Sequence, residues 1–368
     1  MKVSVCRPSE LNASEVQRWR SLQRQTERLR SPFLTPEFAI VMSERRPDQR
    51  LAVIEDGGEI TGYFCFDRGR WGIGRAFCYG VSDAQGVVHA PGYQWNGAEL
   101  LEACGVDVWT FDHLIPDQVQ CFAPGRRIAL RASPMADLSA GWESWTARRK
   151  SNERMREIRR HERKLVRELG APLFETGSRD ASYLDLLMRW KSAQYRRTGR
   201  FDRFAQQWVA MGIRKLFDTR NDGFSAELSV MFVRGSPASL HLSLRFDDTL
   251  AGWFPAYDIN LSSYGVGIIH QLYVLMHAAE RGVRFFDFGA GDEWYKRTFS
   301  DFDISVAAGS VTVSRASAIA LTHQMQTVPR RIVTDFVLRR PPLRRAARRA
   351  LNVIGSVRSL LHSGGSQS

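Results

Sequence analysis

Long apolar runs are missing from this sequence, and none approaches the roughly 18 residues that a membrane-spanning helix needs. The first residues, MKVSVCRPSELNAS, also lack the apolar core of a secretory signal peptide. Cysteine is scarce, with five in 368 residues, and none forms a Cys-x-x-Cys pair or a cluster with histidine. These absences argue against a membrane span and a metal site, so we expect a cytoplasmic chain with reduced thiols.

Acidic residues are outnumbered: 39 Asp and Glu stand against 52 Lys and Arg, which gives a formal net charge of +13. Such a surplus predicts an anionic partner, for which coenzyme phosphates, a membrane surface and RNA are the candidates. Composition alone does not choose among them. The chain is long enough for two domains, and its hydrophobic content of 43% is typical of a globular protein.

Residues 257–299 contain the most informative pattern. A polar turn at Asp258 is followed by a loop with Gly265 and Gly267, then by a helix that Gly282 ends and by a short apolar strand. Glycines in a loop that opens a helix let main-chain N–H groups approach an anion, and the helix N-terminus adds roughly half a positive charge. The pattern predicts a pyrophosphate cradle, although the GxGxxG dinucleotide fingerprint is not met. The residues expected to bind the donor are Ser262, Ser263, Tyr264, Gly265, Val266 and Gly267.

This loop resembles the coenzyme A loop of the GNAT acyltransferases, whose pattern is Gln/Arg-x-x-Gly-x-Gly/Ala, with Ser262 here at the first position. The next segment, FFDFGAGDEWYKRTFSD over 285–301, resembles the CelD/BcsL-like family of bacterial cellulose- and exopolysaccharide-biosynthesis acyltransferases, and more distantly the Fem peptidyltransferases. The resemblance covers most of residues 35–314. It implies an α/β (α+β) fold with two tandem GNAT-like domains and mixed sheets. It also implies acyl-CoA as co-substrate and no tightly bound cofactor.

The element order of the second half has a weaker echo in residues 91–111, which keep only Gly97 in the loop. We therefore expect a degenerate N-terminal GNAT-like domain over 1–141 and a C-terminal acyltransferase domain over 171–315, whose sheet a strand near 304–314 closes. A basic helix over 142–170 links them, and either it is a solvated bridge or it faces phosphate or a membrane. Residues 316–368 form a basic tail, either an amphipathic helix on an anionic membrane or a disordered segment.

Acyl transfer from a thioester to an amine requires a held donor, a polarised carbonyl and a base for the amine. We expect the base where the last strand before the loop separates from the strand after the helix. The predicted catalytic residues are Asp258, Asp287, Lys296, Tyr295, Glu293 and His270, with His241 as a further choice. Burial between Phe286 and Phe288 should raise the pKa of Asp287. The family resemblance implies that Lys296 faces the substrate, and an ordinary structural role is the alternative for each candidate.

The predicted function is transfer of an acyl group from acyl-CoA to an amine, with a hydroxyl as the second choice. The resemblance implies a cell-envelope acceptor, either an amino sugar of a polysaccharide precursor or a long-chain amino lipid such as a sphingoid base. The basic tail favours peripheral contact with the anionic cytoplasmic face of the inner membrane. A Fem-like peptidyltransferase that uses aminoacyl-tRNA is the alternative, and a non-catalytic regulator on the same fold is the third choice. Only the Fem-like alternative predicts nucleic acid as a partner.

Overall fold

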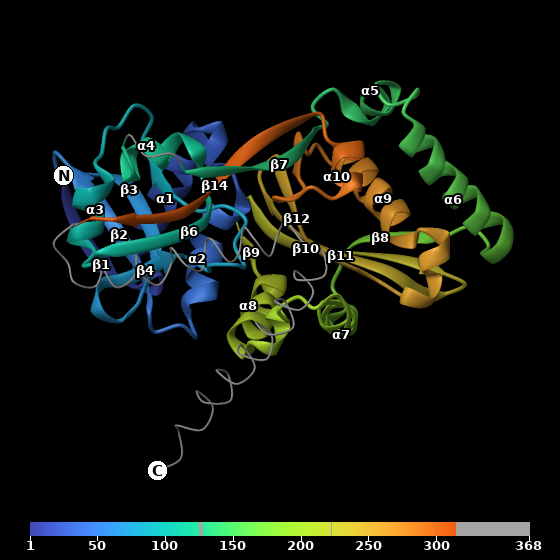
Figure 1. The fold of residues 1–368 in the computed structure, drawn as a ribbon, viewed down its shortest axis with the longest axis horizontal. Helices are drawn as coiled ribbons and strands as arrows, with labels where there is room; N and C mark the ends of the chain where they lie inside the picture. The colour runs from blue at the N-terminus through green and yellow to red at the C-terminus, as the bar shows by residue number, and fades with distance from the viewer. Residues whose placement is uncertain (125–127, 222, 314–368) are drawn as a thin grey trace, which may run out of the picture.

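The structure is a computed structural model that describes residues 1–124, 128–221 and 223–313. A single mixed β-sheet of 14 strands runs through these ranges, in the order β1-β2-β3-β4-β6-β14-β7-β13-β12-β11-β10-β8, with β5 beside β3 and β9 beside β10. The two halves of the chain lie side by side along this sheet (Figure 1). The mixed α/β architecture predicted from the sequence is confirmed.

The first half is a sheet with helices on its faces. Its elements are β1 (Lys2–Cys6), α1 (Ala13–Gln25), α2 (Pro36–Ser43), β2 (Gln49–Asp56), β3 (Glu59–Arg68), β4 (Ile73–Ala76), β5 (Val87–His89), α3 (Gly97–Ala103), β6 (Val108–Leu114) and α4 (Val119–Phe122). A tight turn at Gly57 and Gly58 joins β2 to β3. The first helix is capped by Asn12, whose side chain accepts hydrogen bonds from the N–H groups of Ser14 and Glu15.

The second half repeats this plan. Its elements are β8 (Leu173–Ser178), α7 (Ala181–Thr198), α8 (Gln207–Asp218), β9 (Arg220–Asn221), β10 (Phe224–Val233), β11 (Ser236–Phe246), β12 (Thr249–Tyr257), α9 (Val266–Glu280), β13 (Phe285–Asp287) and α10 (Trp294–Phe299). Short 3-10 helices lie at Pro8–Glu10, Glu27–Leu29, Pro32–Leu34, Arg70–Gly72, Pro116–Gln118, Arg203–Ala205 and Ile259–Tyr264. The strands β10, β11 and β12 form an antiparallel meander.

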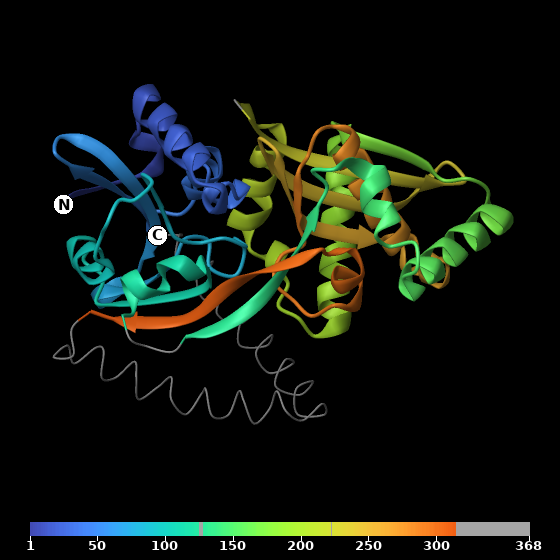
Figure 2. The ribbon, with the colours of Figure 1, turned by 90° about the horizontal axis from the view of Figure 1, so that it is seen from above.

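Two long strands connect the halves, because each of them pairs with a strand of the other half. The strand β7 (Ala129–Asp137) follows β6 along the chain but pairs with β13 of the second half. Conversely, β14 (Phe302–Thr312) follows β13 but pairs with β6 of the first half, and β7 and β14 also pair with each other. Seen from above, the two strands run together between the halves (Figure 2). The strand predicted near 304–314 thus completes the sheet of the first half, not of the second.

The basic segment 142–170 differs from the single helix that was predicted. It forms α5 (Gly141–Ala147) and α6 (Glu153–Leu169), because the side chain of Asn152 caps the second helix by accepting from the N–H groups of Arg154 and Met155. The sparse apolar residues of α6 are buried in the same hydrophobic cluster as α9. The basic helix is therefore packed on the second half along its length, as Figure 1 shows at the right of the molecule.

A wedge opens between two strands of the second half. The strands β12 and β13 pair in parallel only from Thr249 to Ala251 on one and from Phe285 to Asp287 on the other. Beyond that point β13 ends, while β12 continues to Tyr257. The predicted separation of these strands is confirmed. Beyond it, one edge of β12 has no pairing with β13.

None of the helices within the described ranges has the length and hydropathy that crossing a bilayer requires. The tail predicted over 316–368 lies outside the described residues.

Candidate functional site

The glycine loop forms a helix N-terminus with unpaired donors. The 3-10 helix Ile259–Tyr264 leads to Gly265, whose φ of 68° is left-handed, and α9 begins at the next residue. The N–H groups of Ile268 and Ile269 both donate to the carbonyl oxygen of Gly265, at 3.1 Å. No described residue accepts a hydrogen bond from the N–H of Val266 or Gly267. Free N–H groups with a helix dipole behind them are the groups that bind anions at helix N-termini.

Both glycines are needed by the packing around the loop. A Cβ atom on Gly265 would lie 3.3 Å from the ring of His161 on α6, and the left-handed φ would strain any other residue. A Cβ atom on Gly267 would lie 3.0 Å from Cδ1 of Tyr257. The loop therefore leaves no room for side chains at these two positions.

A cleft of about 580 Å³ begins at this loop. Ser262, Gly265, Val266 and Gly267 line it, whereas the predicted donor residues Ser263 and Tyr264 do not. An inner cavity of about 180 Å³ shares lining residues with the cleft and reaches Gly252 and Phe286 at the wedge between β12 and β13. The residues that line both are Lys191, Tyr195, Arg200, Pro255, Gln271, Glu293 and Tyr295. A continuous path thus leads from the helix N-terminus to the strand gap.

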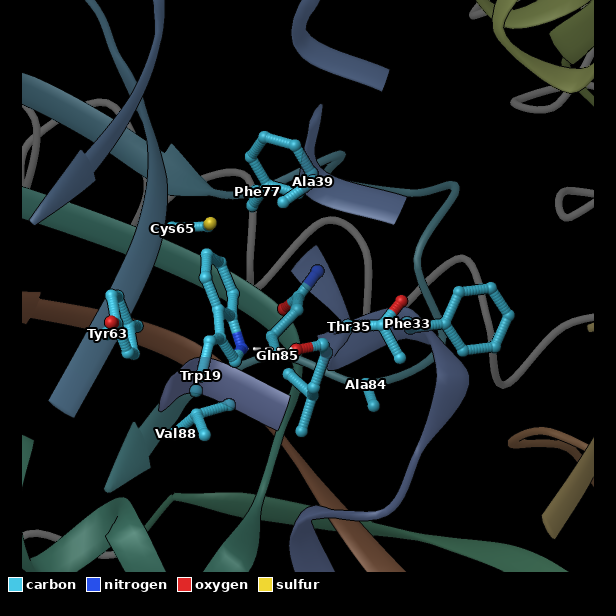
Figure 3. A pocket seen from close by; sticks show the side chains of 12 residues that line it. Trp19, Phe33, Thr35, Ala39, Tyr63, Cys65, Phe77, Ala84, Gln85 and Val88 are labelled. Atoms are coloured by element: carbon cyan, nitrogen blue, oxygen red, sulfur yellow. Dashed lines mark hydrogen bonds between the residues drawn. The ribbon is translucent and has the colours of Figure 1, made fainter. Parts of the chain in front are cut away.

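A second cavity, in the first half, is much smaller. Aromatic side chains from α1, β3 and the segment before α2 surround it (Figure 3), and Trp19 donates a hydrogen bond from Nε1 to the carbonyl oxygen of Leu34 at 2.9 Å. Its volume of about 20 Å³ accommodates roughly one water molecule. A coenzyme does not fit there, so the cleft of the second half is the candidate site.

Two of the predicted catalytic residues, Glu293 and Tyr295, lie on the wall shared by the cleft and the inner cavity. Burial favours the neutral form of the Glu293 carboxyl, but the positive charges of Lys296, 3.3 Å away, and Arg200, 3.9 Å away, outweigh it and hold its pKa below the ordinary value. Burial raises the pKa of the Tyr295 phenol. At neutral pH the site therefore presents an ionised carboxylate beside a protonated phenol.

Asp287 and Lys296 build the turn beneath this wall. Oδ1 of Asp287 accepts from the N–H of Gly289 at 2.8 Å and from the hydroxyl of Ser133 on β7 at 3.2 Å. Burial raises the pKa of Asp287 to about 6, as predicted. Nζ of Lys296 donates to the carbonyl oxygens of Gly289 and Ala290 at 3.0 and 3.1 Å. Lys296 also lines the inner cavity, so it both holds the turn and borders the site.

The other two predicted catalytic residues lie off the cleft wall. The carboxylate of Asp258 caps the 3-10 helix by accepting from the N–H of Asn260. His270 is buried between the hydroxyls of Ser229, 3.0 Å from Nε2, and Ser239, 2.8 Å from Nδ1, and burial lowers its pKa well below the ordinary value. His241 does line the inner cavity, and burial with the charge of Lys191 lowers its pKa to about 3.

Sequence analysis missed the residues that α7 and α9 contribute to the shared wall, above all Lys191 and Gln271. Lys191 lies one turn after Leu187 and one turn before Tyr195, both of which are buried. Residues four apart share a helix face. A lysine on the apolar face of an amphipathic helix was therefore the signal available in the sequence.

The first half also reaches the site, through a residue that sequence analysis did not select. Asp83, from the segment between β4 and β5, lines the inner cavity, and burial raises its pKa. Its Oδ2 lies 3.0 Å from where a Cβ atom on Gly289 would be, so that glycine allows the two halves to touch. Oδ1 of Asp83 lies 3.7 Å from Nε2 of His113 at the end of β6. The inner cavity thus has walls from both halves.

Comparison with protein families identifies one match. Residues 152–297 match the family model described as "Acetyltransferase (GNAT) domain". This range is less than half of the chain, and it includes the glycine loop, the strand wedge and most of α10. A search of curated protein sequences finds no match.

Three of the solved structures that resemble this chain illustrate the shared fold. They are the C-terminal domain (DUF2156) of a lysylphosphatidylglycerol synthetase from Agrobacterium fabrum (14% identity, TM-score 0.55, covering 85% of this chain and 95% of that one), a conserved protein of unknown function from Bacteroides thetaiotaomicron (10%, 0.55, 84% and 100%) and FemX (12%, 0.53, 84% and 96%). At these identities the likeness concerns the fold alone. The predicted GNAT-like fold of two halves is confirmed, and with the family match it supports the acyltransferase class.

Proposed function

We propose that this chain is an acyltransferase that moves an acyl group from acyl-CoA directly to an amine of a cell-envelope acceptor. One observation carries the proposal: the loop of Val266 and Gly267, whose N–H groups lack acceptors among the described residues, lines a cleft that shares its wall with the cavity at the wedge between β12 and β13. Anion binding at one end and a strand gap at the other are what a long thioester donor with a diphosphate requires.

In this proposal the diphosphate of the donor binds the N-terminus of α9, and the thioester lies in the wedge. The acceptor amine attacks the carbonyl carbon, so a C–N bond forms and the C–S bond breaks. The Glu293 carboxylate takes a proton from the amine, and the Tyr295 phenol gives its proton to the departing thiolate, which leaves as the thiol. The phenolate then regains a proton from the Glu293 carboxyl, so both side chains return to their starting states. Glu293 fits the role of base because it is ionised and lines the shared wall, where Nζ of Lys296 lies 3.3 Å from its Oε2.

The lining of the inner cavity bears on the substrate. Charged side chains surround it: Asp83, Lys191, Arg200, Glu293 and Lys296. An alkyl chain gains about 0.8 kcal/mol for each buried methylene only where its surroundings are apolar. We therefore favour a short acyl group, and of the two envelope acceptors we favour the amino sugar over the long-chain amino lipid. The excess positive charge fits a cytoplasmic reaction beside the anionic inner membrane.

Release of free thiol from acyl-CoAs of increasing chain length, with amino sugars and sphingoid bases as acceptors, tests the proposal. We expect release with acetyl-CoA and an amino sugar, and little with long-chain donors. Ser262→Glu should block the donor by charge repulsion, because Ser262 lines the cleft. The matched control is Ser263→Glu, which adds the same charge at the neighbouring exposed residue that does not line the cleft. Absence of release with every donor contradicts the proposal.

A second candidate function, transfer from aminoacyl-tRNA, is supported by α6. Two of its cationic side chains lie near the cleft: Cζ of Arg154 is 5.5 Å from the ring centre of Trp294, which lines the cleft, and Nζ of Lys164 is 4.9 Å from that of Tyr264 in the glycine loop. Binding of tRNA that weakens steeply between about 50 and 200 mM salt favours it. A non-catalytic regulator is the third candidate, and coenzyme binding without release for any acceptor favours that one.

A further inference from the structure

Lys191 lies at the junction of the two cavities. It comes from α7, which packs over β12, and its Nζ donates to the carbonyl oxygen of Pro255 at 2.9 Å. Pro255 belongs to the stretch of β12 that continues beyond the pairing with β13. Lysine has three N–H donors, so this one hydrogen bond leaves others for a ligand. The ammonium group therefore lies beside the position that the proposal gives to the carbonyl group of the thioester.

Gln271 supplies a second donor at the same junction. It lies four residues after Gly267, on the same face of α9, and it also lines both cavities. Its side chain is only 6% exposed, and its Nε2 is buried without a hydrogen-bond partner among the described residues. A buried amide donor left without an acceptor is costly, so its persistence here points to a ligand atom that accepts from it.

The main chain of β12 has no hydrogen-bond donor at Pro255. Pro255 has no N–H, and its carbonyl oxygen already accepts from Lys191. A main-chain N–H that would polarise the carbonyl of the donor therefore cannot come from residue 255. Side-chain donors are the available replacement at that position.

We propose that Lys191 and Gln271 together form the oxyanion site of the acyl transfer, which donates two hydrogen bonds to the carbonyl oxygen of the thioester. This inference rests on the proposed function. When the amine attacks, the carbonyl π electrons move to oxygen, and the two donors stabilise the negative charge. When the C–S bond breaks, the electrons return and the thiolate leaves. The proton lost by the amine goes to Glu293, so Lys191 stays protonated throughout.

The groups around Lys191 determine the pH range over which its amine stays protonated. Burial, together with the charges of Arg200 and Lys296 and against that of Glu293, lowers the pKa of Lys191 to about 8. The ring of Tyr195 lies 5.5 Å from Nζ, and burial keeps that phenol protonated by raising its pKa. His241 stays neutral. Because the protonated amine is the active form, the rate constant of the chemical step should fall as pH rises through about 8.

Steady-state and single-turnover kinetics of Lys191→Met and Gln271→Met, with coenzyme affinity from calorimetry, test this inference. Removal of one oxyanion donor lowers kcat by about 100- to 1000-fold in comparable sites. We expect losses of that order with the donor KM and the coenzyme Kd changed less than about threefold. The exposed residues Lys150 and Gln25 provide the matched controls Lys150→Met and Gln25→Met, which should keep full activity. In Lys191→Arg the descending limb of the pH profile should move to higher pH, because guanidinium stays charged.

The outcomes separate this inference from the proposed function. If the unaltered protein releases thiol but both methionine variants stay within about twofold of its kcat, the oxyanion assignment is overturned. The same holds if coenzyme affinity falls in proportion to kcat, since the residues would then only hold the donor. If the unaltered protein binds coenzyme but releases no thiol from any donor, the proposed function fails, and this inference fails with it.

Discussion

The helix α3 begins at Gly97 in the first half, and α9 begins beside Gly265 in the second. Each is followed by a strand that pairs in parallel with a strand from before the helix: β6 with β4, and β13 with β12. In α3 the side chain of Asn96 accepts from the N–H groups of Ala98 and Glu99. In α9 the N–H of Gly267, at the position of Ala98, has no acceptor among the described residues, whereas the N–H of Ile268, at the position of Glu99, donates to the carbonyl oxygen of Gly265.

The two glycines also differ in their surroundings, because Gly97 is closely packed and the loop of Gly265 lines a cleft. A Cβ atom on Gly97 would lie 2.6 Å from Cα of Phe122 and from the carbonyl oxygen of Cys121, so that glycine serves the packing of α4 against α3. The glycine loop of α9 instead opens onto a cleft. One element order thus supports two uses of a helix N-terminus, self-capping for stability and an open end for an anion. What separates them is a capping side chain and a neighbouring helix.

The largest effect is expected when a side chain fills the space at the N-terminus of α9. In Gly267→Val the new side chain must displace Tyr257, which the Cβ atom would approach to 3.0 Å, and it occupies the wall beside the free N–H groups. A charge-assisted hydrogen bond contributes about 1.5–3 kcal/mol. Coenzyme A affinity should therefore fall about 10- to 100-fold, as measured by calorimetry. Unchanged affinity in a folded variant would refute the assignment of the anion site.

The equivalent change in the first half should act on stability alone. Gly97→Ala places a methyl group against main-chain atoms of α4, which cannot rotate away. Overpacking of this kind costs about 1–3 kcal/mol of unfolding free energy. We expect a lower urea midpoint and a coenzyme Kd within about twofold of the original. A large loss of coenzyme affinity would mean that the first half takes part in donor binding.

The sequence alone allows prediction of most of the second half, because its signals are local. The meander, the glycine loop, the helix after it and the strand wedge follow from apolar periodicity and from turn residues that are close in sequence. The loop residues that line the cleft, and Glu293 and Tyr295 beyond it, lie within about forty residues of one another. The raised pKa of Asp287 also follows from its aromatic neighbours.

The features that the sequence did not predict depend on long-range pairing. Nothing local tells β14 to pair with β6, more than 180 residues away in the chain, instead of closing its own half. Likewise, Asp83 reaches the site only because the halves share one sheet. His270 looks like a surface helix residue until β10 and β11 provide the serine hydroxyls that bury and satisfy it. Lys191 was hidden because a charged residue on an amphipathic helix is assigned to the solvent face by default.

Each half contains a buried carboxyl group, so the two halves can also be compared through the pH dependence of stability. Burial raises the pKa of Asp287 in the second half and of Asp67 in the first to about 6. The folded protein therefore binds more protons than the unfolded chain between about pH 4 and pH 6, and each group makes stability fall as pH rises through that range. Asp287→Asn and Asp67→Asn should each flatten this fall in urea unfolding.

The two substitutions should differ in a second measurement. Asp287 orients the turn that carries Glu293 and Lys296, whereas Asp67 pairs with Arg46 at 3.0 Å and accepts from Gln49 at 3.1 Å, away from the cleft. Only Asp287→Asn should change the pH profile of thiol release. An equal change in both variants would show that the turn is not coupled to the site.

The smallest expected effect concerns the capped helix. Asn96→Ala removes the acceptor from the N–H groups of Ala98 and Glu99, which leaves α3 with free donors like those of α9. Loss of such a cap costs about 1 kcal/mol, as measured by urea unfolding. The matched change is Asn152→Ala at the start of α6, where the capping geometry is the same. Neither variant should gain a second coenzyme site in calorimetry, because Phe122 and Cys121 still close the space beside Gly97. Free N–H groups at a helix N-terminus would then be necessary for the anion site but not sufficient, since the cleft must be open as well. A second binding event in Asn96→Ala would instead mean that the cap alone separates the two halves.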